Sequence, residues 1–277
     1  MPATFPARPL ILAAALMSAV APIPAAMAQT SRAAAEIAAA VAAPTRTAAN
    51  VARDRYRHPA ETLAFFEIKP TDTVVEIWPG GGWYTEILAP YLKGRGTLWA
   101  VDFWPDSLKG VRALQAKDPA LYGAIRLAAF PASGDQPVVP SGSADAVVTF
   151  RNVHNWQMGY KRDGKDYGLE AFRQMYAMLK PGGVLGIEDH RLPEGDDVAR
   201  EKSSGYVKVS TVRRLAEQAG FVFEGASEIN ANPKDTTQWE KGVWTLPPRF
   251  ANGEVDKEKY AAIGESDRMT LRFRKPK

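Results

Sequence analysis

Two of the three histidines in this 277-residue chain follow predicted strands of a parallel sheet. His154 comes shortly after the apolar run 145–150, and His190 ends the run 184–190, directly after Asp189. Imidazole titrates near neutral pH, so a histidine beside a carboxylate suits a general base that takes a proton from a hydroxyl or an amine. We therefore predict that His154, His190 and Asp189 form the catalytic group.

A structural role and a metal-binding role compete with the catalytic role of these histidines. Histidines at strand ends are commonly hydrogen-bonded structural residues, and His58, beside Pro59, fits that description best. The histidines, with Asp189 and Glu188, could also bind a divalent metal ion. No His-x-x-x-His spacing supports this alternative, and we predict no metal site.

A second group of residues could bind a nucleoside. The apolar run 74–77 predicts a buried strand, which Pro79 and the glycines 80–82 end in a tight turn. Apolar residues then recur at helical spacing up to residue 92. Glycines let a ligand approach the backbone, and a helix N-terminus attracts anions. Asp102 ends the next strand about 20 residues later, where a carboxylate typically accepts hydrogen bonds from ribose hydroxyls.

The spacing of the glycines favours one nucleoside ligand over another. A dinucleotide fingerprint reads G-x-G-x-x-G, but the third position counted from Gly80 and Gly82 is Thr85. A Tyr-x-x-x-Lys pair is also missing from the expected stretch. An NAD-dependent oxidoreductase is therefore the weaker alternative.

The elements that must position these residues alternate between strand and helix from residue 73, which is typical of a parallel sheet covered on both faces. The strands that we predict cover residues 74–77, 97–103, 124–130, 145–150, 184–190, 221–229 and 269–274. The fold class is thus α/β, a Rossmann-like, doubly wound and mostly parallel seven-stranded sheet with an N-terminal helical extension. Ligands of such sheets bind beyond the carboxyl ends of the strands. Both groups of candidate residues lie at these strand ends.

Several sequence motifs of the chain resemble motifs of the class I S-adenosylmethionine-dependent methyltransferases. They are Glu76-x-x-x-Gly80-x-Gly82, AMLKPGGVLGIEDH (177–190) and FRNVHNW (150–156). Together with HPAETLAFF, these motifs are similar to a group of predicted exported methyltransferases of bacteria. The family pattern is acid-x-Gly-x-Gly-x-Gly, and Trp78 replaces its first glycine here. Because a residue before proline favours extended backbone, Trp78 could prolong the strand, and the alternative is that its side chain crowds the floor of the cofactor site.

The resemblance implies S-adenosylmethionine as the cofactor. It implies that Glu76 holds the methionine end, Asp102 the ribose and Asp135 the adenine amino group. The predicted cofactor-binding set is Glu76, Trp78, Gly80, Gly81, Gly82, Asp102, Phe103, Asp135 and Asn152. The expected function is methyl transfer to a small-molecule acceptor, whose pocket Asn155 and Trp156 would line. A non-catalytic periplasmic ligand-binding protein on the same fold is the alternative.

Composition and the first residues bear on partners and location. The formal charge of +4 is small and no run of Lys or Arg concentrates it, so no nucleic-acid partner is expected. Arg8, the apolar run 10–20 and Ala26-Met27-Ala28 form a secretory signal peptide, which predicts cleavage after Ala28. The run is too short to span a bilayer, so no integral membrane segment is expected after cleavage. We expect a periplasmic or secreted protein.

The domain organisation follows from these limits. Residues 1–28 are the predicted signal peptide, and residues 29–59 an alanine-rich helical lead or linker. Residues 60–277 are the predicted methyltransferase-like domain. The chain has no cysteine, so its stability must come from packing and not from disulfides.

Overall fold

The computed structural model describes Met1 and residues 25–277, with side chains described from Arg32 onwards. Apart from Met1 and the backbone of residues 25–28, the predicted signal peptide lies outside the described residues. Within the described part of the chain, no helix combines the length and the apolar composition needed to cross a membrane.

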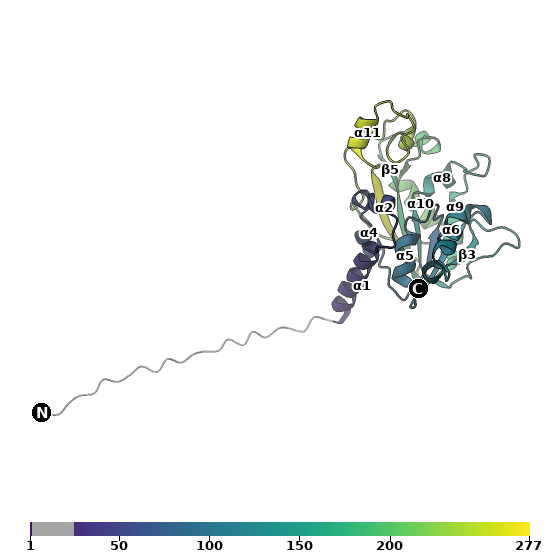
Figure 1. The fold of residues 1–277 in the computed structure, drawn as a ribbon. Coiled ribbons are helices and arrows are strands. Elements are labelled where there is room, and N and C mark those ends of the chain that lie inside the picture. Colours follow the sequence, from purple (N-terminus) through teal and green to yellow (C-terminus); the bar gives the residue numbers. More distant parts are fainter. Residues whose placement is uncertain (2–24) are drawn as a thin grey trace.

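A mixed eight-stranded sheet forms the centre of the molecule (Figure 1). Its strand order is β3-β2-β1-β4-β5-β8-β7, and the short β6 pairs with the end of β5. Strands β1 to β5 are parallel, whereas β8 runs antiparallel to both β5 and β7. The strands are β1 (Thr73–Ile77), β2 (Thr97–Asp102), β3 (Arg126–Ala129), β4 (Ala144–Phe150), β5 (Leu179–Leu192), β6 (Val207–Lys208), β7 (Val222–Ser227) and β8 (Arg268–Arg274). The predicted α/β fold class is confirmed, while β6 is absent from the predicted strands.

Helices cover both faces of the sheet because its buried strands are apolar on both sides. In β1, Val74 packs into the same core as Ile87, whereas Val75 packs into the core that holds Phe172. The helices of the first face are α1 (Ala25–Val41), α4 (Pro59–Phe65), α5 (Thr85–Leu92), α6 (Lys109–Lys117) and α7 (Pro119–Tyr122), with η1 (Asp106–Leu108) before α6. Those of the second face are α8 (Val153–Gln157), α9 (Gly168–Met178) and α10 (Val209–Gln218). The molecule therefore has three layers, with the sheet between two layers of helices.

The N-terminal segment is part of the packed structure. Ile37 is 1% exposed, and α1 lies against α4 and α5. Two short helices, α2 (Ala48–Val51) and α3 (Asp54–Arg57), connect α1 to α4. The Arg46 guanidinium makes a bidentate ion pair with the Asp54 carboxylate in this connection. The described part of this segment is helical, and it covers apolar surface of the sheet domain.

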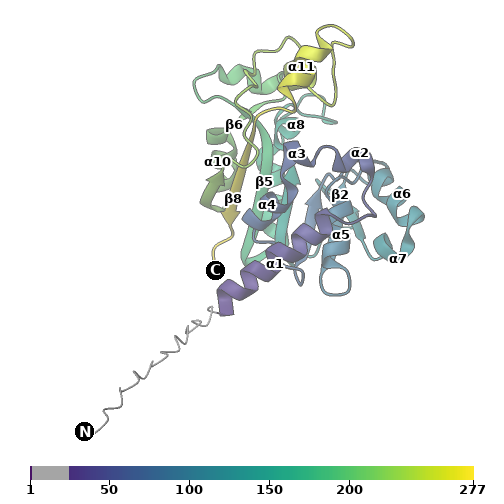
Figure 2. The same cartoon turned by 60° about the vertical axis from the view of Figure 1, so that its left-hand side comes forward.

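A long segment between β7 and β8 stands over the carboxyl ends of the parallel strands, near α8 and β6 (Figure 2). It contains η3 (Gly242–Thr245) and α11 (Lys257–Ile263), and η2 (Val198–Lys202) lies before β6. The Asp235 carboxylate ties the segment to the domain by accepting a hydrogen bond from Tyr206 Oη, and it accepts another from Trp239 Nε1 within the segment. The Trp244 ring lies 6.4 Å from the ring of His154, so this segment covers the candidate site.

The prediction that Trp78 prolongs the first strand is wrong. β1 ends at Ile77, and Trp78 has φ = +50°, a left-handed conformation that glycine adopts without strain. Its indole compensates by packing against Phe103 and Trp156, with ring centroids 5.2 and 5.9 Å away, and its Nε1 donates to the carbonyl oxygen of Phe130. The turn therefore keeps the backbone shape of a glycine although the residue is tryptophan.

Candidate functional site

The glycine turn after β1 leaves room for a ligand. Gly80 and Gly82 have φ values of +57° and +86°. A Cβ atom added at Gly80 or Gly81 would meet no heavy atom within 4 Å, whereas one at Gly82 would clash with Leu114. The backbone of Gly80 and Gly81 is thus open on the side where a cofactor could approach, and Gly82 is needed for packing.

Asp102 lies at the end of β2, beside this turn. The residue is 7% exposed, and its Oδ1 accepts a hydrogen bond from the backbone N–H of Phe103 at 2.7 Å. Burial raises the pKa of the Asp102 carboxyl to about 6, so it is ionised at neutral pH. The carboxylate has further lone pairs for ribose hydroxyls, and together with the open glycine backbone it fits an adenosyl group.

Three other predicted cofactor-binding residues have partners of their own or lie in solvent. Glu76 is buried on the α5 face of the sheet, where its Oε2 accepts a hydrogen bond from Thr85 Oγ1 at 2.6 Å. Asn152 donates from Nδ2 to the carbonyl oxygen of Ile77 and so links β4 to the end of β1. Asp135 is exposed in the loop after β3. Glu76 and Asn152 therefore support the frame of the turn, and their direct contact with a cofactor remains a prediction.

Glu76 gives a stability prediction. Burial raises the pKa of its carboxyl from the usual 4.5 to about 7. The folded state then binds a proton more tightly than the unfolded state, so the free energy of unfolding falls as pH rises from about 4.5 to 7 and stays low above that. Glu76→Gln should therefore raise the free energy of unfolding at pH 8 by about 1–2 kcal/mol, and little at pH 4. Urea unfolding at both pH values, with the exposed Glu61→Gln as control, tests this. Destabilisation by Glu76→Gln at pH 8 would show that the fold requires the carboxylate.

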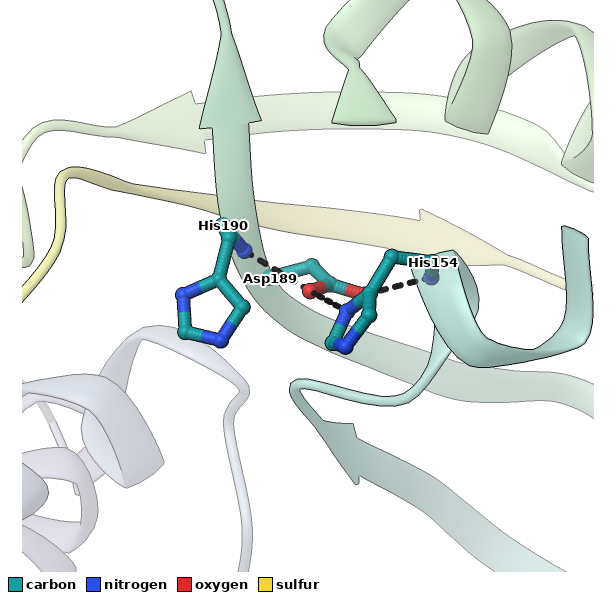
Figure 3. Close-up of side chains that lie close together, drawn as sticks. All are labelled: His154, Asp189 and His190. Carbon is teal, nitrogen blue, oxygen red and sulfur yellow. Dashed lines mark hydrogen bonds and ion pairs between the residues drawn. The ribbon is translucent and has the colours of Figure 1, made fainter. Parts of the chain in front are cut away.

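His154 and Asp189 form a buried histidine–carboxylate pair. Asp189, on β5, is fully buried, and its Oδ1 lies 2.7 Å from Nδ1 of His154 on α8. In Figure 3 the carboxylate points toward the His154 ring. The backbone N–H groups of His154 and His190 also donate to this carboxylate, at 3.3 and 2.7 Å. The carboxylate thus places the proton of His154 on Nδ1 and leaves Nε2 as the basic nitrogen.

The other two histidines are in different situations. His190 is 8% exposed, its ring lies 5.1 Å from that of His154, and its Nδ1 contacts Ser266 Oγ. Burial, followed by the charge of His154 and nearby arginines, keeps the pKa of His190 well below its usual value. His58 lies at the turn between α3 and α4, where its Nδ1 is 3.4 Å from Asn230 Oδ1. The structure brings His154 and His190 together with Asp189, and His58 is not part of this group.

Trp156 does not line a pocket, so that prediction is wrong. The side chain is fully buried in the core beneath α9, where it contacts Phe172 edge-on. Trp83 is also a core residue, and its Nε1 donates to the carbonyl oxygen of Asn50. The fifth residue of FRNVHNW, His154, faces the site, while the last faces the core, because both belong to the short helix α8.

A group of arginines, two of them fully buried and two half-buried, lies beside these histidines, and the sequence does not predict it. We call it the arginine cluster, and it consists of Arg53, Arg57, Arg151 and Arg268 with the carboxylates of Glu188 and Glu265. The phrase RDRYRHP (53–59) contains two of the arginines, but charged residues before a domain normally suggest an exposed segment. Their partner Glu265 is more than 200 residues away in the chain, so the sequence alone carries no signal of burial.

The metal-binding alternative is weakened by these arginines. Ligand atoms of His154, Asp189 and His190 do lie within 4.8 Å of one another. However, Asp189 already accepts from Nδ1 of His154, and the charges of Arg268, Arg151 and Arg57 act on His190. An added cation would be repelled by these guanidinium groups, so the surroundings favour an anion over a metal ion.

A hollow of about 330 Å³ lies elsewhere on the surface. It is lined by residues of α8, α9 and α10 and of the loop before α9, among them Tyr167, Glu170 and Arg214. None of the predicted site residues lines it. The candidate catalytic and cofactor-binding residues therefore lie outside this hollow.

Comparisons with known proteins agree with the fold. A family profile described as a methyltransferase domain matches residues 75–187, from β1 into β5. A SAM-dependent methyltransferase from Aquifex aeolicus is similar in structure, with 14% identity and a TM-score of 0.53, over 87% of this chain and 98% of that chain. A protein from Galdieria sulphuraria proposed as a sarcosine dimethylglycine methyltransferase has 18% identity and a TM-score of 0.54, over 78% of this chain and 82% of that chain.

A proposed methyltransferase from Bacillus halodurans is also similar, with 19% identity and a TM-score of 0.51, over 79% of this chain and 98% of that chain. No curated protein matches the chain. The similar solved structures support the arrangement of strands and helices, and the matched profile spans the glycine turn, Asp102 and His154. The comparisons support neither the oxidoreductase nor the non-catalytic alternative.

Proposed function

We propose that the protein methylates a hydroxyl or amine group of a small molecule, with His154 as the general base. The premise is that residues 75–187 match a methyltransferase-domain profile and that an S-adenosylmethionine-dependent methyltransferase shares the fold. When bound, S-adenosylmethionine supplies a methyl group already activated by its sulfonium. The chain itself must then hold the acceptor, orient it and remove its proton.

The observation that carries this proposal is the 2.7 Å contact between His154 Nδ1 and Asp189 Oδ1 at the carboxyl edge of the sheet. Asp189 fixes the tautomer, so Nε2 of His154 carries a lone pair. Nε2 makes no hydrogen bond with any residue of the described chain, so it is available to a ligand. As the acceptor oxygen or nitrogen attacks, its proton passes to Nε2, and Asp189 stabilises the resulting imidazolium.

His190 is less suited to this role. Its lowered pKa makes it a weak base, and its Nδ1 is engaged with Ser266 Oγ. A neutral imidazole can still orient an acceptor by hydrogen bonding. We therefore assign proton removal to His154 and propose that His190 helps to position the acceptor.

Residues for the cofactor lie on the first half of the sheet. Asp102 would accept hydrogen bonds from the ribose hydroxyls, and the backbone of Gly80 and Gly81 is open to a ligand. Phe103 and Trp78 offer aromatic faces beside Asp102. Since β1 and β4 are neighbours, these residues and His154 lie at one edge, as methyl transfer between two bound molecules requires.

Calorimetric titration followed by a transfer assay tests the proposal. The purified chain should bind S-adenosylhomocysteine and S-adenosylmethionine with micromolar dissociation constants and should not bind NAD. A panel of hydroxyl- and amine-bearing small molecules should then accept labelled methyl groups from S-adenosylmethionine. Binding of NAD, or of none of the three compounds, would contradict the proposed function.

A further inference from the structure

The arginine cluster contains more positive than negative charge. Four guanidinium groups face the carboxylates of Glu188 and Glu265, an excess of two positive charges. Both carboxylates are at most 2% exposed, and so are Arg57 and Arg268, whereas Arg53 and Arg151 are half-buried. An uncompensated buried charge is costly, so such a group normally has a counterion.

Several donors of the cluster have no protein partner. Arg57 is fully buried and bonds to Glu265 through Nε, but its Nη1 and Nη2 have no partner among the described residues. The side chain of Arg151 makes no hydrogen bond with any residue from 25 to 277, and its Nε is buried. Arg53 Nη2 and Arg268 Nε are also buried and have no hydrogen-bond partner within residues 25–277. Guanidinium donors in this arrangement are suited to the oxygens of a carboxylate or a phosphate.

The backbone also holds Arg151 in place at a cost. Arg151 directly follows β4 and has φ = +64°, in the left-handed region. Its backbone N–H donates to the carbonyl oxygen of Glu188 at 2.7 Å, which fixes the residue at the end of the strand. A non-glycine residue in this conformation is strained, and strain of this kind concentrates at functional sites.

The cluster adjoins the proposed catalytic group. Arg268 lies opposite His190 in the pairing of β8 with β5, and the His190 ring lies 5.1 Å from that of His154. Arg151 directly follows β4 and is separated from His154 by Asn152 and by Val153, the first residue of α8. A molecule whose anionic group reached Arg57 and Arg151 would thus extend toward His154.

We propose that Arg57 and Arg151 bind a carboxylate or phosphate group of the methyl acceptor, so that the acceptor is an anionic small molecule. This inference rests on the proposed function. The same chemistry would also suit the carboxylate of the cofactor's methionine part, and the two sources make different predictions. A site for the acceptor leaves the affinity for the cofactor unchanged when an arginine is removed.

Arg151→Gln is the variant of choice because it breaks no hydrogen bond to the described protein. It removes repulsion from Arg268 and Arg53 together with attraction to Glu188 and Glu265, so these changes partly cancel and we expect the variant to fold. Arg57→Gln is the second variant, and Arg173→Gln, on an exposed position of α9, is the matched control with the same change of charge.

Titration of these proteins with inorganic phosphate tests the anion site. Phosphate should bind the wild type and Arg173→Gln equally, and Arg151→Gln at least tenfold more weakly. Arg57→Gln should weaken phosphate binding in the same way as Arg151→Gln, and S-adenosylhomocysteine should bind all four proteins within twofold. In the transfer assay, an acceptor bearing a carboxylate should react with a lower KM than its amide analogue, and Arg151→Gln should remove this difference.

Three results would count against the inference. Equal phosphate binding by Arg151→Gln and Arg173→Gln would show that there is no anion site at the cluster. A loss of S-adenosylhomocysteine affinity in Arg151→Gln, without a loss for 5′-methylthioadenosine, would assign the arginines to the cofactor's carboxylate. If the wild type binds phosphate through Arg151 but not S-adenosylhomocysteine, the anion site stands and the proposed methyl transfer is wrong.

Discussion

Replacement of His154 by alanine is expected to lower kcat for methyl transfer by about 10²–10⁴-fold while the dissociation constant for S-adenosylhomocysteine stays within twofold. His154 is 3% exposed, and its Nδ1 is held by Asp189, so the imidazole is both oriented and shielded from bulk water. Without it, the acceptor proton has to leave to water. Asp189→Asn should cost about 10–100-fold in kcat, because the amide neither fixes the tautomer nor stabilises the imidazolium.

Controls separate this catalytic role from a structural one. Added imidazole should restore part of the kcat of His154→Ala, which no structural role would explain. His58→Asn is the matched control, since His58 has φ = +38° and asparagine tolerates the left-handed region. It should retain wild-type kcat. If His154→Ala keeps wild-type kcat with an intact fold, His154 is not the base, and a lack of rescue by imidazole would assign it to packing.

The second large effect is expected at Asp102. Asp102→Asn should weaken binding of S-adenosylhomocysteine by about 5- to 150-fold, because the ribose loses a pair of charge-assisted hydrogen bonds worth about 1–3 kcal/mol. The wild type should bind with constant affinity above pH 7 and progressively more weakly below pH 6, where the carboxyl with its pKa of about 6 becomes protonated. Calorimetry between pH 5 and pH 8 measures both effects.

The same substitution should make the unliganded protein more stable. The pKa of Asp102 is raised from the usual 3.8, so the folded state binds a proton more tightly than the unfolded state. The free energy of unfolding therefore decreases as pH rises from about 4 to 6, and asparagine should recover about 1–3 kcal/mol at pH 7.5. Asp106→Asn, an exposed control on η1, should change neither property. Unchanged cofactor affinity in Asp102→Asn would remove the ribose assignment.

Much of the fold could be predicted because the sheet is buried on both faces. Strands such as Thr73–Ile77 and Ala144–Phe150 are apolar on both sides and end at glycine, proline or polar residues, so their positions agree with the predicted ranges. Asp102, His154 and Asp189 could be placed at one edge for the same reason, since all carboxyl ends of parallel strands meet there. Their precise partners, such as Thr85 for Glu76, depend on helix packing that periodicity does not encode.

Features that depend on distant segments could not be predicted. The buried Arg57 guanidinium is paired with the Glu265 carboxylate, which is 208 residues away in the sequence. The packing of α1 depends on apolar surface of α4 and α5 that an alanine-rich sequence does not reveal. The proline after Trp78 favours extended backbone, but the geometry of the turn overrides that local preference.

The conformation of Trp78 has a consequence for how relatives of this protein can be recognised. At this position a glycine would give the same backbone with less strain, so the tryptophan contributes through its side chain and not through the shape of the turn. A search that requires glycine at this position would classify the tryptophan as loss of the cofactor-binding motif. A search for a left-handed residue after the first strand, with a ring that reaches the carbonyl oxygen at the end of the third, would gather proteins that share this variant of the turn.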